Sequence, residues 1–363
     1  MTKHTLEELR ERIDELDRDI VKLLNQRMNL CQDIGHFKSA AARNVVDTER
    51  EAEILRRLAS ENPGPLSEQT LSAVFREIFS GSRALQTPVT IAFLGPAGTY
   101  THEAAIQMFG HSASFLPCMT VHDVFEEVIH GGVTYAVAPI ENSIEGSVRE
   151  TLDLLMTSSI GVCREVSLRV SHALMNLTGR IEDIGQVISH PQALAQCRQW
   201  LADKLPGIRL QETSSTARAA EQAMENEGIA AIASERLGMR LGLQIIRRGI
   251  QDRPENITRF FALGRQKPLP TGDDKTSIVF WTEDKPGALH EILIKFAQHG
   301  INLSRIESRP DRGAVPWKYA FFVDLEGHRD DAEVATCLKE IAGKRTMVKV
   351  LGSFPSRPLP AGE

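Results

Sequence analysis

Apolar residues recur every three or four positions through the first part of the chain, which is the spacing of one face of an α-helix. The longest stripe follows Thr5 and Glu8, a capping-box pattern that favours a helix start. Its members are Leu6, Leu9, Ile13, Leu16, Ile20, Leu23, Leu30, Ile34 and Phe37. Two shorter amphipathic stretches follow Asp47 and Ser67, which are both good N-cap residues. The pattern predicts an all-α domain over residues 1–87, with one long helix and two shorter ones.

The pattern changes at residue 88, where short apolar runs begin to alternate with helical stretches. The candidate strands are residues 89–94, 135–139, 187–189, 229–233 and 257–263. This alternation predicts an α/β domain over residues 88–265, and the polar stretch 266–274 has the composition of a linker. Strands and helices then follow in the order βαββαβ over residues 276–354, which is typical of a ferredoxin-like α+β domain.

Composition and charge narrow the class of protein. The chain has 363 residues, of which 42% are hydrophobic and 25% charged, so it can bury two or three ordinary cores. A net charge of -6 argues against nucleic acid or an anionic membrane surface as the main partner. The five cysteines include no C-x-x-C pair, which indicates neither a disulfide framework nor a zinc site. Because the N-terminus is charged and no apolar run reaches about 18 residues, we expect no signal peptide, no membrane span and a cytoplasmic protein.

One position of the long apolar stripe carries a charge. Arg27 stands between Leu23 and Leu30, where the spacing predicts an apolar residue. An unpaired guanidinium in an apolar seam is costly, so Arg27 needs a carboxylate partner or a bound anion. Lys38 lies further along the same face, at a distance of roughly 16 Å, so the two side chains could converge on one small dianion.

Other polar residues flank this seam. Arg10 precedes Lys38 by roughly 42 Å along a straight helix, so it could reach the same ligand only from another subunit. Ser82 and Gln86 stand where the inner face of the third helix would continue with apolar residues. Polar groups at such positions are expected to meet something polar.

A simpler structural interpretation needs no ligand. In this interpretation, Arg27 pairs with an acid such as Asp47 or Glu51, and Lys38 extends its ammonium group to solvent. The polar residues of the third helix would then mark a fraying helix end.

The joint pattern resembles the helical, AroQ-type chorismate mutase domain over its whole length. The matching segments are L-R-E-R-I-D-E-L-D at 9–17, Q-R at 26–27, G-H-F-K at 35–38, D-T-E-R-E at 47–51, and Ser82 with Gln86. Chorismate is a dicarboxylate that rearranges in one pericyclic step, so positioning and electrostatics must supply the catalysis. The resemblance implies four catalytic residues, which are Arg10 of a second subunit, Arg27, Lys38 and Gln86. It implies further substrate contacts from Asp47, Arg50, Glu51 and Ser82.

Four polar segments follow strands of the middle domain, which is how open α/β sheets build a ligand crevice. They are G-P-A-G-T-Y-T-H-E at 95–103, P-I-E-N-S-I-E-G at 139–146, S-H-P-Q-A-L-A-Q-C at 189–197 and N-I-T-R-F at 256–260. The first is a glycine turn opening a helix, where an anion is favoured, but it is neither a Walker loop nor a dinucleotide fingerprint. The pair His102-Glu103 lacks the second histidine of a zinc protease. We therefore expect neither a nucleotide cofactor nor a metal.

The order and wording of these segments resemble prephenate dehydratase, a bilobal fold similar to type 2 periplasmic binding proteins. The resemblance implies that Thr258 of the T-R-F motif is essential, and we interpret it as a hydrogen-bond donor to the departing hydroxyl group. It implies substrate contacts from Asn142, Ser143, His190, Gln192 and Arg259, although His190 could equally be a structural histidine. In an extended strand Thr258 and Arg259 point to opposite faces, so Arg259 could instead grip a neighbouring loop or a domain interface.

Two segments of the last domain, D-K-P-G-A-L at 284–289 and E-S-R-P at 307–310, resemble the ACT domain attached to these dehydratases. The resemblance implies a regulatory site for L-phenylalanine at a subunit interface. Its expected residues are Gly287, Ala288, Leu289, Glu307, Ser308, Arg309 and Pro310. An oligomerisation module without a ligand is the competing interpretation of this domain.

Together the resemblances imply a multidomain enzyme that acts as a homodimer or a larger homo-oligomer without a cofactor. It would convert chorismate to prephenate, and prephenate to phenylpyruvate with loss of water and CO2, under inhibition by phenylalanine. The missing dinucleotide fingerprint argues against a mutase fused to a prephenate dehydrogenase. Two further hypotheses stay open, namely a dehydratase that prefers arogenate and an amino-acid sensor without catalytic activity.

Overall fold

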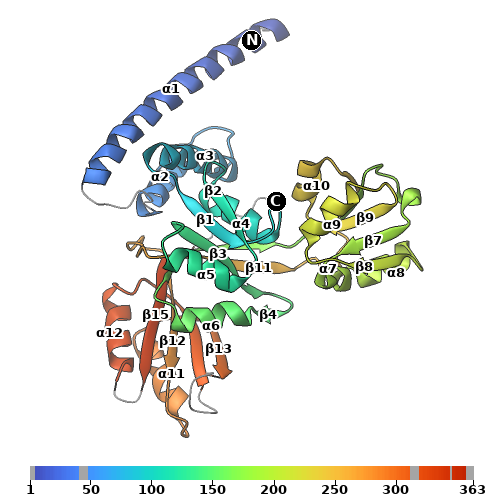
Figure 1. The fold of residues 1–363 in the computed structure, drawn as a ribbon. Helices are drawn as coiled ribbons and strands as arrows, with labels where there is room; N and C mark the ends of the chain where they lie inside the picture. The colour runs from blue at the N-terminus through green and yellow to red at the C-terminus, as the bar shows by residue number, and fades with distance from the viewer. Residues whose placement is uncertain (1–4, 41–47, 311–318, 344–345, 357–363) are drawn as a thin grey trace. The chain divides into compact units, whose positions relative to one another are not determined.

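The computed structural model describes residues 5–40, 48–310, 319–343 and 346–356, except for the side chains of residues 38–40, 48 and 49. The chain divides into two compact units. Residues 1–89 with 109–114 form the first, which we call the helical unit, and residues 90–108 with 115–363 form the second, the sheet unit (Figure 1).

The helical unit contains the three helices that the sequence predicts. They are α1 (Leu6–Ala40), α2 (Thr48–Glu61) and α3 (Glu68–Gln86). The capping box that starts α1 is formed, because Thr5 N–H donates to Glu8 Oε2 (2.9 Å) and Glu8 N–H donates to Thr5 Oγ1 (3.2 Å). Ser67 caps α3 by accepting from the N–H of Thr70 (3.1 Å). The expected all-α region is confirmed.

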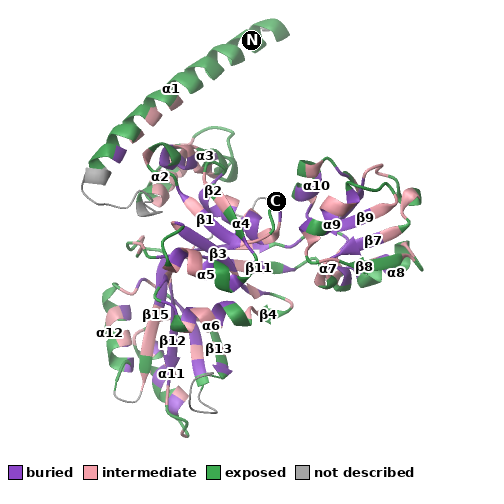
Figure 2. Cartoon of the chain, in the orientation of Figure 1, coloured by how far each residue is buried: buried purple, intermediate pink, exposed green. Residues whose placement is uncertain are grey.

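The apolar stripe of α1 is exposed along its whole length (Figure 2). Its nine members, from Leu6 to Phe37, are between 45% and 79% exposed. A helix with an exposed apolar face of this length needs something to cover it, because amphipathic helices derive most of their stability from packing that face. In the described part of the chain, no helix has both the length and the apolar composition needed to cross a membrane.

The sheet unit begins with two sheets that form two lobes. The first sheet has the order β2-β1-β3-β11-β5, with β4 paired to β3. Its strands are β1 (Thr90–Leu94), β2 (Ser114–Cys118), β3 (Tyr135–Asn142), β4 (Gly146–Ser147), β5 (Gly161–Arg169) and β11 (Ile257–Gly264). Its helices are α4 (Tyr100–Phe109), α5 (Val121–Ile129) and α6 (Arg149–Thr157). Because β11 returns from the second lobe to the middle of this sheet, the chain crosses between the lobes twice.

The second sheet has the order β10-β6-β9-β7-β8. Its strands are β6 (Ala173–Asn176), β7 (Gln186–Ser189), β8 (Arg209–Glu212), β9 (Ile229–Ala233) and β10 (Gln244–Arg248). Its helices are α7 (Pro191–Gln196), α8 (Arg198–Lys204), α9 (Thr216–Ala223) and α10 (Glu235–Leu241). Every strand expected from the sequence is present, as β1, β3, β7, β9 and β11, and the remaining strands of the two lobes were missed.

The C-terminal sheet has the order β13-β14-β12-β15. Its strands are β12 (Asp274–Trp281), β13 (Leu303–Pro310), β14 (Tyr319–Glu326) and β15 (Met347–Pro355). Helices α11 (Ala288–Gln298) and α12 (Ala332–Ile341) pack on one face, where Ile278 and Phe280 of β12 meet Phe296 of α11. This arrangement confirms the expected βαββαβ, ferredoxin-like region.

The other face of the C-terminal sheet packs on the first sheet. Val279 and Trp281 of β12 lie in one buried apolar cluster with Phe261 of β11. At the same contact, a Cβ on Gly352 of β15 would collide with the backbone of Val162 of β5, so only glycine fits this close approach. The two sheets therefore share one core.

The stretch 266–274, expected as a linker, is anchored to the sheets that it joins. Tyr135 donates its hydroxyl to the side chain of Gln266, and Cys163 Sγ donates to the Gln266 carbonyl (3.2 Å). His328 Nε2 lies 3.1 Å from the Pro268 carbonyl oxygen. The segment that connects the two regions is therefore packed against both of them.

Candidate active sites

The charged position in the apolar seam of the helical unit lies against α3. Arg27 donates from Nη1 to Ser82 Oγ (2.5 Å), and its guanidinium lies 5.5 Å from the ring centroid of Phe79. Ser82 in turn donates to the carbonyl oxygen of Ile78 (2.7 Å). Among the described residues Arg27 has no carboxylate partner, and Glu51 forms its ion pair with Arg83 instead. The structure thus brings Arg27 and Ser82 together and leaves the arginine charge uncompensated by the described side chains.

Gln86, the last residue of α3, is packed against α1. A Cβ on Gly35 would lie 2.8 Å from Gln86 Cγ, so the glycine makes room for this side chain. The Oε1 atom of Gln86 is buried and has no hydrogen-bond partner within the described residues. Leaving a buried polar atom without a partner costs about 1–3 kcal/mol, so the site favours a ligand that satisfies it. The side chain of Lys38, three residues after Gly35, and all of Asp47 lie outside the described residues.

Two other expected mutase residues lie on the surface of the unit. Arg50 pairs with Glu53 (2.5 Å), and both side chains are more than half exposed. Arg10 is exposed on α1, roughly 26 Å before Arg27 along the helix. Within one chain, Arg10 is therefore too far along the helix to share one small ligand with Arg27.

Arg83 is a buried residue of the helical unit that the sequence analysis missed. Its Nη2 donates to the Phe109 carbonyl (2.7 Å), and its Nη1 pairs with Glu51. Arg83 follows Phe79 by four residues, so its place on the inner face of α3 was the available signal. Because Arg83 holds the Glu51 carboxylate, it fixes one of the expected substrate contacts.

In the first lobe of the sheet unit, Thr258 of β11 lies beside Asn142 at the end of β3. The two residues are register partners, each about 9% exposed, and Asn142 Nδ2 donates to Thr258 Oγ1 (2.8 Å). Asn142 Oδ1 accepts from the backbone N–H groups of Ile144 (3.0 Å) and Glu145 (3.1 Å), which fixes the carboxamide. Since the threonine oxygen accepts from Asn142, its own O–H remains available to donate to a bound molecule.

A chain of polar side chains continues from this pair. Asn142 Nδ2 also donates to Asn256 Oδ1 (2.7 Å), and Asn256 Nδ2 donates to Gln196 Oε1 (3.2 Å). His172 Nε2 lies 2.9 Å from the same Gln196 oxygen. Burial lowers the pKa of His172, so this histidine is neutral at physiological pH. The sequence analysis missed His172 and Gln196 as members of this network.

A cavity of about 270 Å³ opens at the end of the network. Its lining includes Gln192, Gln196 and Asn256, together with the charged residues Glu145, Asp252 and Arg253. Gln192 was expected to contact substrate, whereas Arg253 is a cation that the sequence analysis missed. The cavity therefore combines amide groups with one positive and two negative charges, and Asn256 of its lining connects it to the Thr258 and Asn142 pair.

Two expected substrate contacts are occupied by backbone groups. His190 caps α7, because its Nδ1 accepts from the N–H of Gln192 (3.3 Å). Ser143 Oγ donates to the Glu255 carbonyl (3.1 Å) and accepts from the N–H of Ile257 (2.9 Å). These contacts match the structural interpretation of His190 and give Ser143 a comparable role in its loop.

Arg259, also expected to contact substrate, instead binds carboxylate groups of the protein. It donates to Glu141 (2.9 Å), Glu165 (2.8 Å) and Asp324 (2.9 Å), on the side of β11 opposite to Thr258. Burial works to lower the pKa of Arg259, but Glu165 and Asp324 outweigh it, so the pKa is raised and the charge is fixed. These contacts match the alternative in which Arg259 grips a domain interface, because its guanidinium already has three carboxylate partners.

The glycine turn before α4 is also occupied. Gly98 N–H donates to His102 Nδ1 (3.0 Å), so a backbone group that a bound anion would need is already used. Ser234, from the second lobe, donates to Glu103 (2.5 Å). Burial raises the pKa of Glu103 despite this hydrogen bond. One N–H group of the turn is thus used locally, and helix α4, which follows the turn, is hydrogen-bonded to the second lobe.

The two expected regulatory segments lie on different parts of the C-terminal region. Gly287 has φ = 83° and precedes α11, Ala288 is buried and Leu289 is half-buried. Along β13, Glu307 contacts Ser147 and Arg305. Arg309 donates to the Arg149 carbonyl (2.8 Å) and pairs with Asp153 (3.0 Å). Ser308 and Pro310 are exposed. Glu307 and Arg309 thus face the first lobe, and their neighbours face solvent.

Three family models match consecutive parts of this chain. The model for chorismate mutase type II matches residues 9–87, the model for prephenate dehydratase matches residues 91–268, and the model for the ACT domain matches residues 276–343.

Curated proteins that combine these parts are similar to the chain over nearly its whole length. The bifunctional chorismate mutase/prephenate dehydratase of Aquifex aeolicus is 43% identical over 354 residues, which are 96% of this chain and 98% of that protein. The protein of the same name from Stutzerimonas stutzeri is 41% identical over 360 residues, 98% of each chain. Among solved structures, prephenate dehydratase from Arthrobacter aurescens in complex with L-Phe is 38% identical, with a TM-score of 0.66 over 74% of this chain and 90% of that one.

Proposed function

The chain belongs to the bifunctional chorismate mutase/prephenate dehydratase family, and we propose the following division of its two reactions among its residues. It is an isomerase that converts chorismate to prephenate and a lyase that converts prephenate to phenylpyruvate with release of water and CO2. The domains we assign are residues 1–87 for the mutase, 88–265 for the dehydratase and 276–354 for regulation. Its five cysteines lack paired spacing, which suits the cytoplasm.

For the mutase, the observation that carries the assignment is the charge of Arg27, which has no carboxylate partner among the described residues and is bonded to Ser82, four residues before Gln86 on α3. Arg27, held by Ser82, binds a substrate carboxylate. The carboxamide of Gln86 and the ammonium group of Lys38 donate to the ether oxygen, whose negative charge grows as its bond to carbon breaks. Asp47, Arg50 and Glu51 complete the contacts to the ring side of the substrate.

The mutase site requires two copies of the chain. The exposed apolar stripe of α1 fits the same stripe of a second copy, since a two-fold interface pairs one surface with itself. Such pairing would place Arg10 of the partner near Arg27, a distance that one helix cannot close on itself. We therefore assign a homodimer as the smallest active form.

For the dehydratase, Thr258 donates its hydroxyl proton in a hydrogen bond to the departing ring hydroxyl. Asn142 orients Thr258, and the cavity lined by Gln192 and Arg253 receives the rest of prephenate. The arginine offers a positive charge to one of the two substrate carboxylates. The C–O bond to the ring hydroxyl and the C–C bond to the ring carboxylate then break together without a covalent intermediate, and the departing oxygen takes up one proton from solvent, relayed through Thr258, to leave as water.

For regulation, the ACT domain binds L-phenylalanine and lowers dehydratase activity. The residues we assign to this site are Gly287, Ala288, Leu289, Glu307, Ser308, Arg309 and Pro310. Ligand binding that favours one arrangement of the sheet unit would shift the population of the active form.

The experiment supplies purified protein with chorismate alone, without a nicotinamide cofactor, and follows chorismate loss and phenylpyruvate formation with and without L-phenylalanine. Phenylpyruvate that forms, and is suppressed by phenylalanine, is the expected result. Accumulation that stops at prephenate would remove the dehydratase assignment, and no turnover at all would favour the amino-acid sensor. Comparing kcat/KM for prephenate and arogenate then decides the preferred substrate.

A further inference from the structure

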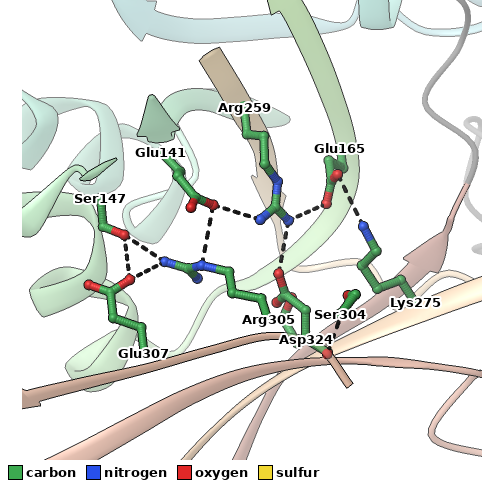
Figure 3. Close-up of polar contacts among 10 residues, drawn as sticks. Glu141, Ser147, Glu165, Arg259, Lys275, Ser304, Arg305, Glu307 and Asp324 are labelled. Carbon is green, nitrogen blue, oxygen red and sulfur yellow. Dashed lines mark hydrogen bonds and ion pairs between the residues drawn. The ribbon is translucent and has the colours of Figure 1, made fainter. Parts of the chain in front are cut away.

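A network of buried charges lies where the C-terminal sheet packs on the first sheet (Figure 3). Arg259 of β11 binds Glu141 of β3, Glu165 of β5 and Asp324 of β14. Its side chain is 18% exposed, and those of Glu165 and Asp324 are 6% and 3% exposed. One guanidinium thus connects three strands of the dehydratase domain, its own included, to the ACT domain.

A second arginine reaches the same network from the ACT domain. Arg305 of β13 lies with Nε 3.2 Å from Glu141 Oε2, and its Nη2 donates to Ser147 Oγ (2.7 Å) and pairs with Glu307. Lys275 of β12 joins through Glu165 (3.3 Å). These groups are largely removed from water, so each charge depends on its partners.

In both β11 and β3, a residue of the network directly neighbours a residue of the proposed dehydratase site along the chain. Thr258 pairs with Asn142 in the β11 and β3 ladder, and Arg259 pairs with Glu141 in the next register position. Successive side chains of a strand point to opposite faces, so the first pair faces the substrate side and the second faces the ACT domain. The register between β11 and β3 shifts directly after Arg259, so these two pairs have a different register from the pairs that follow in β11. A shift of Glu141 therefore moves the backbone that carries Asn142.

Strand β13 connects the network to the proposed phenylalanine site. Arg305 and Glu307 face the dehydratase domain, while Ile306 between them and Ser308 after them are exposed. A ligand or a second subunit that binds the exposed face of β13 acts on the strand that positions Arg305.

We propose that Arg259 is a positioning residue for Thr258 and Asn142, and that Glu141, shared with Arg305, transmits the state of the ACT domain to this pair. The inference rests on the proposed function and deepens it. Arg259 touches no reacting atom in this scheme. By thermodynamic reciprocity, the factor by which phenylalanine weakens binding of substrate equals the factor by which substrate weakens binding of phenylalanine.

The test compares Arg305→Gln with the control Lys349→Met. Lys349 of β15 also crosses this interface, donating to the carbonyls of Leu155 (2.7 Å), Met156 (3.0 Å) and Ser158 (2.6 Å), but it has no contact with Glu141 or Arg259. For each protein, equilibrium dialysis measures phenylalanine binding with and without a prephenate analogue, and a rate assay measures dehydratase inhibition. Mutase activity of the same sample checks concentration and folding.

In the wild type and Lys349→Met, we expect a coupling of about 5-fold to 150-fold. In Arg305→Gln, phenylalanine should still bind, but the coupling should fall below about 2-fold. An unchanged coupling in Arg305→Gln, or an equal loss in Lys349→Met, would overturn the proposal. A wild type that makes no phenylpyruvate from prephenate would instead contradict the proposed function.

A second variant tests the positioning role without removing the charge. Arg259→Lys keeps the charge but cannot reach three carboxylates at once. We expect kcat for prephenate to fall about 10-fold to 100-fold with little change in KM, because the residue positions Thr258 and does not bind substrate. A rise in KM at constant kcat would show direct substrate binding, and wild-type values of both constants would show that the network does not position the site.

Discussion

The two units treat the same type of group, the arginine guanidinium, in opposite ways. In the helical unit, Arg27 lies in an apolar seam with a hydroxyl partner and, among the described residues, no carboxylate. In the sheet unit, Arg259 is surrounded by three carboxylates. The first arrangement leaves a positive charge without a counter-charge among the described side chains, whereas the second uses the charge to join two sheets. Residue type alone therefore did not distinguish an arginine without a described counter-charge from one that joins two sheets, and the partners did.

The two units also differ in whether their apolar faces are covered within one chain. The stripe of α1 is exposed, while the apolar face of the C-terminal sheet that carries Val279 and Trp281 is covered by the first sheet. The apolar stripe of the helical unit thus stays uncovered within one chain, whereas the sheet unit covers its internal interface within one chain. Five variants would break or sharpen this contrast.

The largest effect is expected from Thr258→Val, which removes the hydroxyl donor and keeps the side-chain shape. Dehydratase kcat should fall by about 10²-fold to 10³-fold, because the departing hydroxyl loses its hydrogen bond. Phenylpyruvate formation from prephenate measures this loss, and mutase activity on the same sample should be unchanged. Thr258→Ser should recover much of the rate. A valine variant with wild-type turnover would rule out the hydroxyl as the donor.

Arg27→Met should lower mutase kcat/KM by on the order of 10²-fold, because the substrate loses a charge that stabilises its transition state. The conversion of chorismate to prephenate measures it, with dehydratase activity as the internal reference. Arg18→Met is the matched control, since Arg18 is exposed on the same helix and bonds only to a backbone carbonyl in the described structure. Equal losses in both variants would mean that helix α1 tolerates no such change and would remove the special role of Arg27.

Ile20→Asp places a charge in the exposed stripe of α1 and should weaken association of the helical units. Mutase activity should fall by about tenfold or more at micromolar concentration, since Arg10 of the partner is lost, while dehydratase activity persists. Sedimentation velocity and mutase assays over a dilution series measure both effects. Asn25→Asp introduces the same residue away from the stripe and should leave both unchanged. A monomeric Ile20→Asp variant with full mutase activity would show that one chain suffices.

The pH dependence of the mutase tests the donor at residue 86. A carboxamide donates at any ordinary pH, so the wild-type rate should be nearly flat from about pH 5 to 9. Gln86→Glu should act only when its carboxyl group is protonated, so its rate should fall by about tenfold for each pH unit above the pKa of that group. A steep loss above neutral pH in the wild type would count against Gln86 as the donor.

The smallest effect concerns Glu103, whose pKa is raised by burial. The folded state therefore holds the proton more tightly than the unfolded state. The contribution of Glu103 to the free energy of unfolding is full below the pKa of the unfolded state and is lost as pH rises through the pKa of the folded state. Glu103→Gln removes that loss and keeps an acceptor for Ser234. At pH 7 the melting temperature should rise by on the order of a few degrees, with no rise at pH 4. An equal shift at both values would assign the effect to packing.

Local structure was largely predictable from the sequence. The capping box at Thr5 and Glu8, the strand β9 and the βαββαβ order all depend on neighbouring residues, and all are present. Strand β5 was missed because Arg164 and Glu165 interrupt its apolar pattern. Both charges have partners far away in sequence, Arg164 at the Met108 carbonyl and Glu165 at Arg259.

The sites were predictable only in part, for the same reason. The polar residue Ser82 on the inner face of α3 indicated a polar contact there, and the structure contains its hydrogen bond with Arg27. The pairing of Glu51 with Arg83, and of Arg259 with carboxylates from both domains, depends on how distant segments pack. Periodicity gives the face on which a side chain lies, but it does not give the partner across that face.

The close approach at Gly352 has a consequence for anyone who wishes to divide the protein. A fragment that ends before β12 would uncover Phe261 and its apolar neighbours, which the C-terminal sheet now covers. Such a fragment should need solubilising substitutions on that face, or it will aggregate. In practical terms, an enzyme freed from feedback is better obtained by a point substitution in β13 than by truncation.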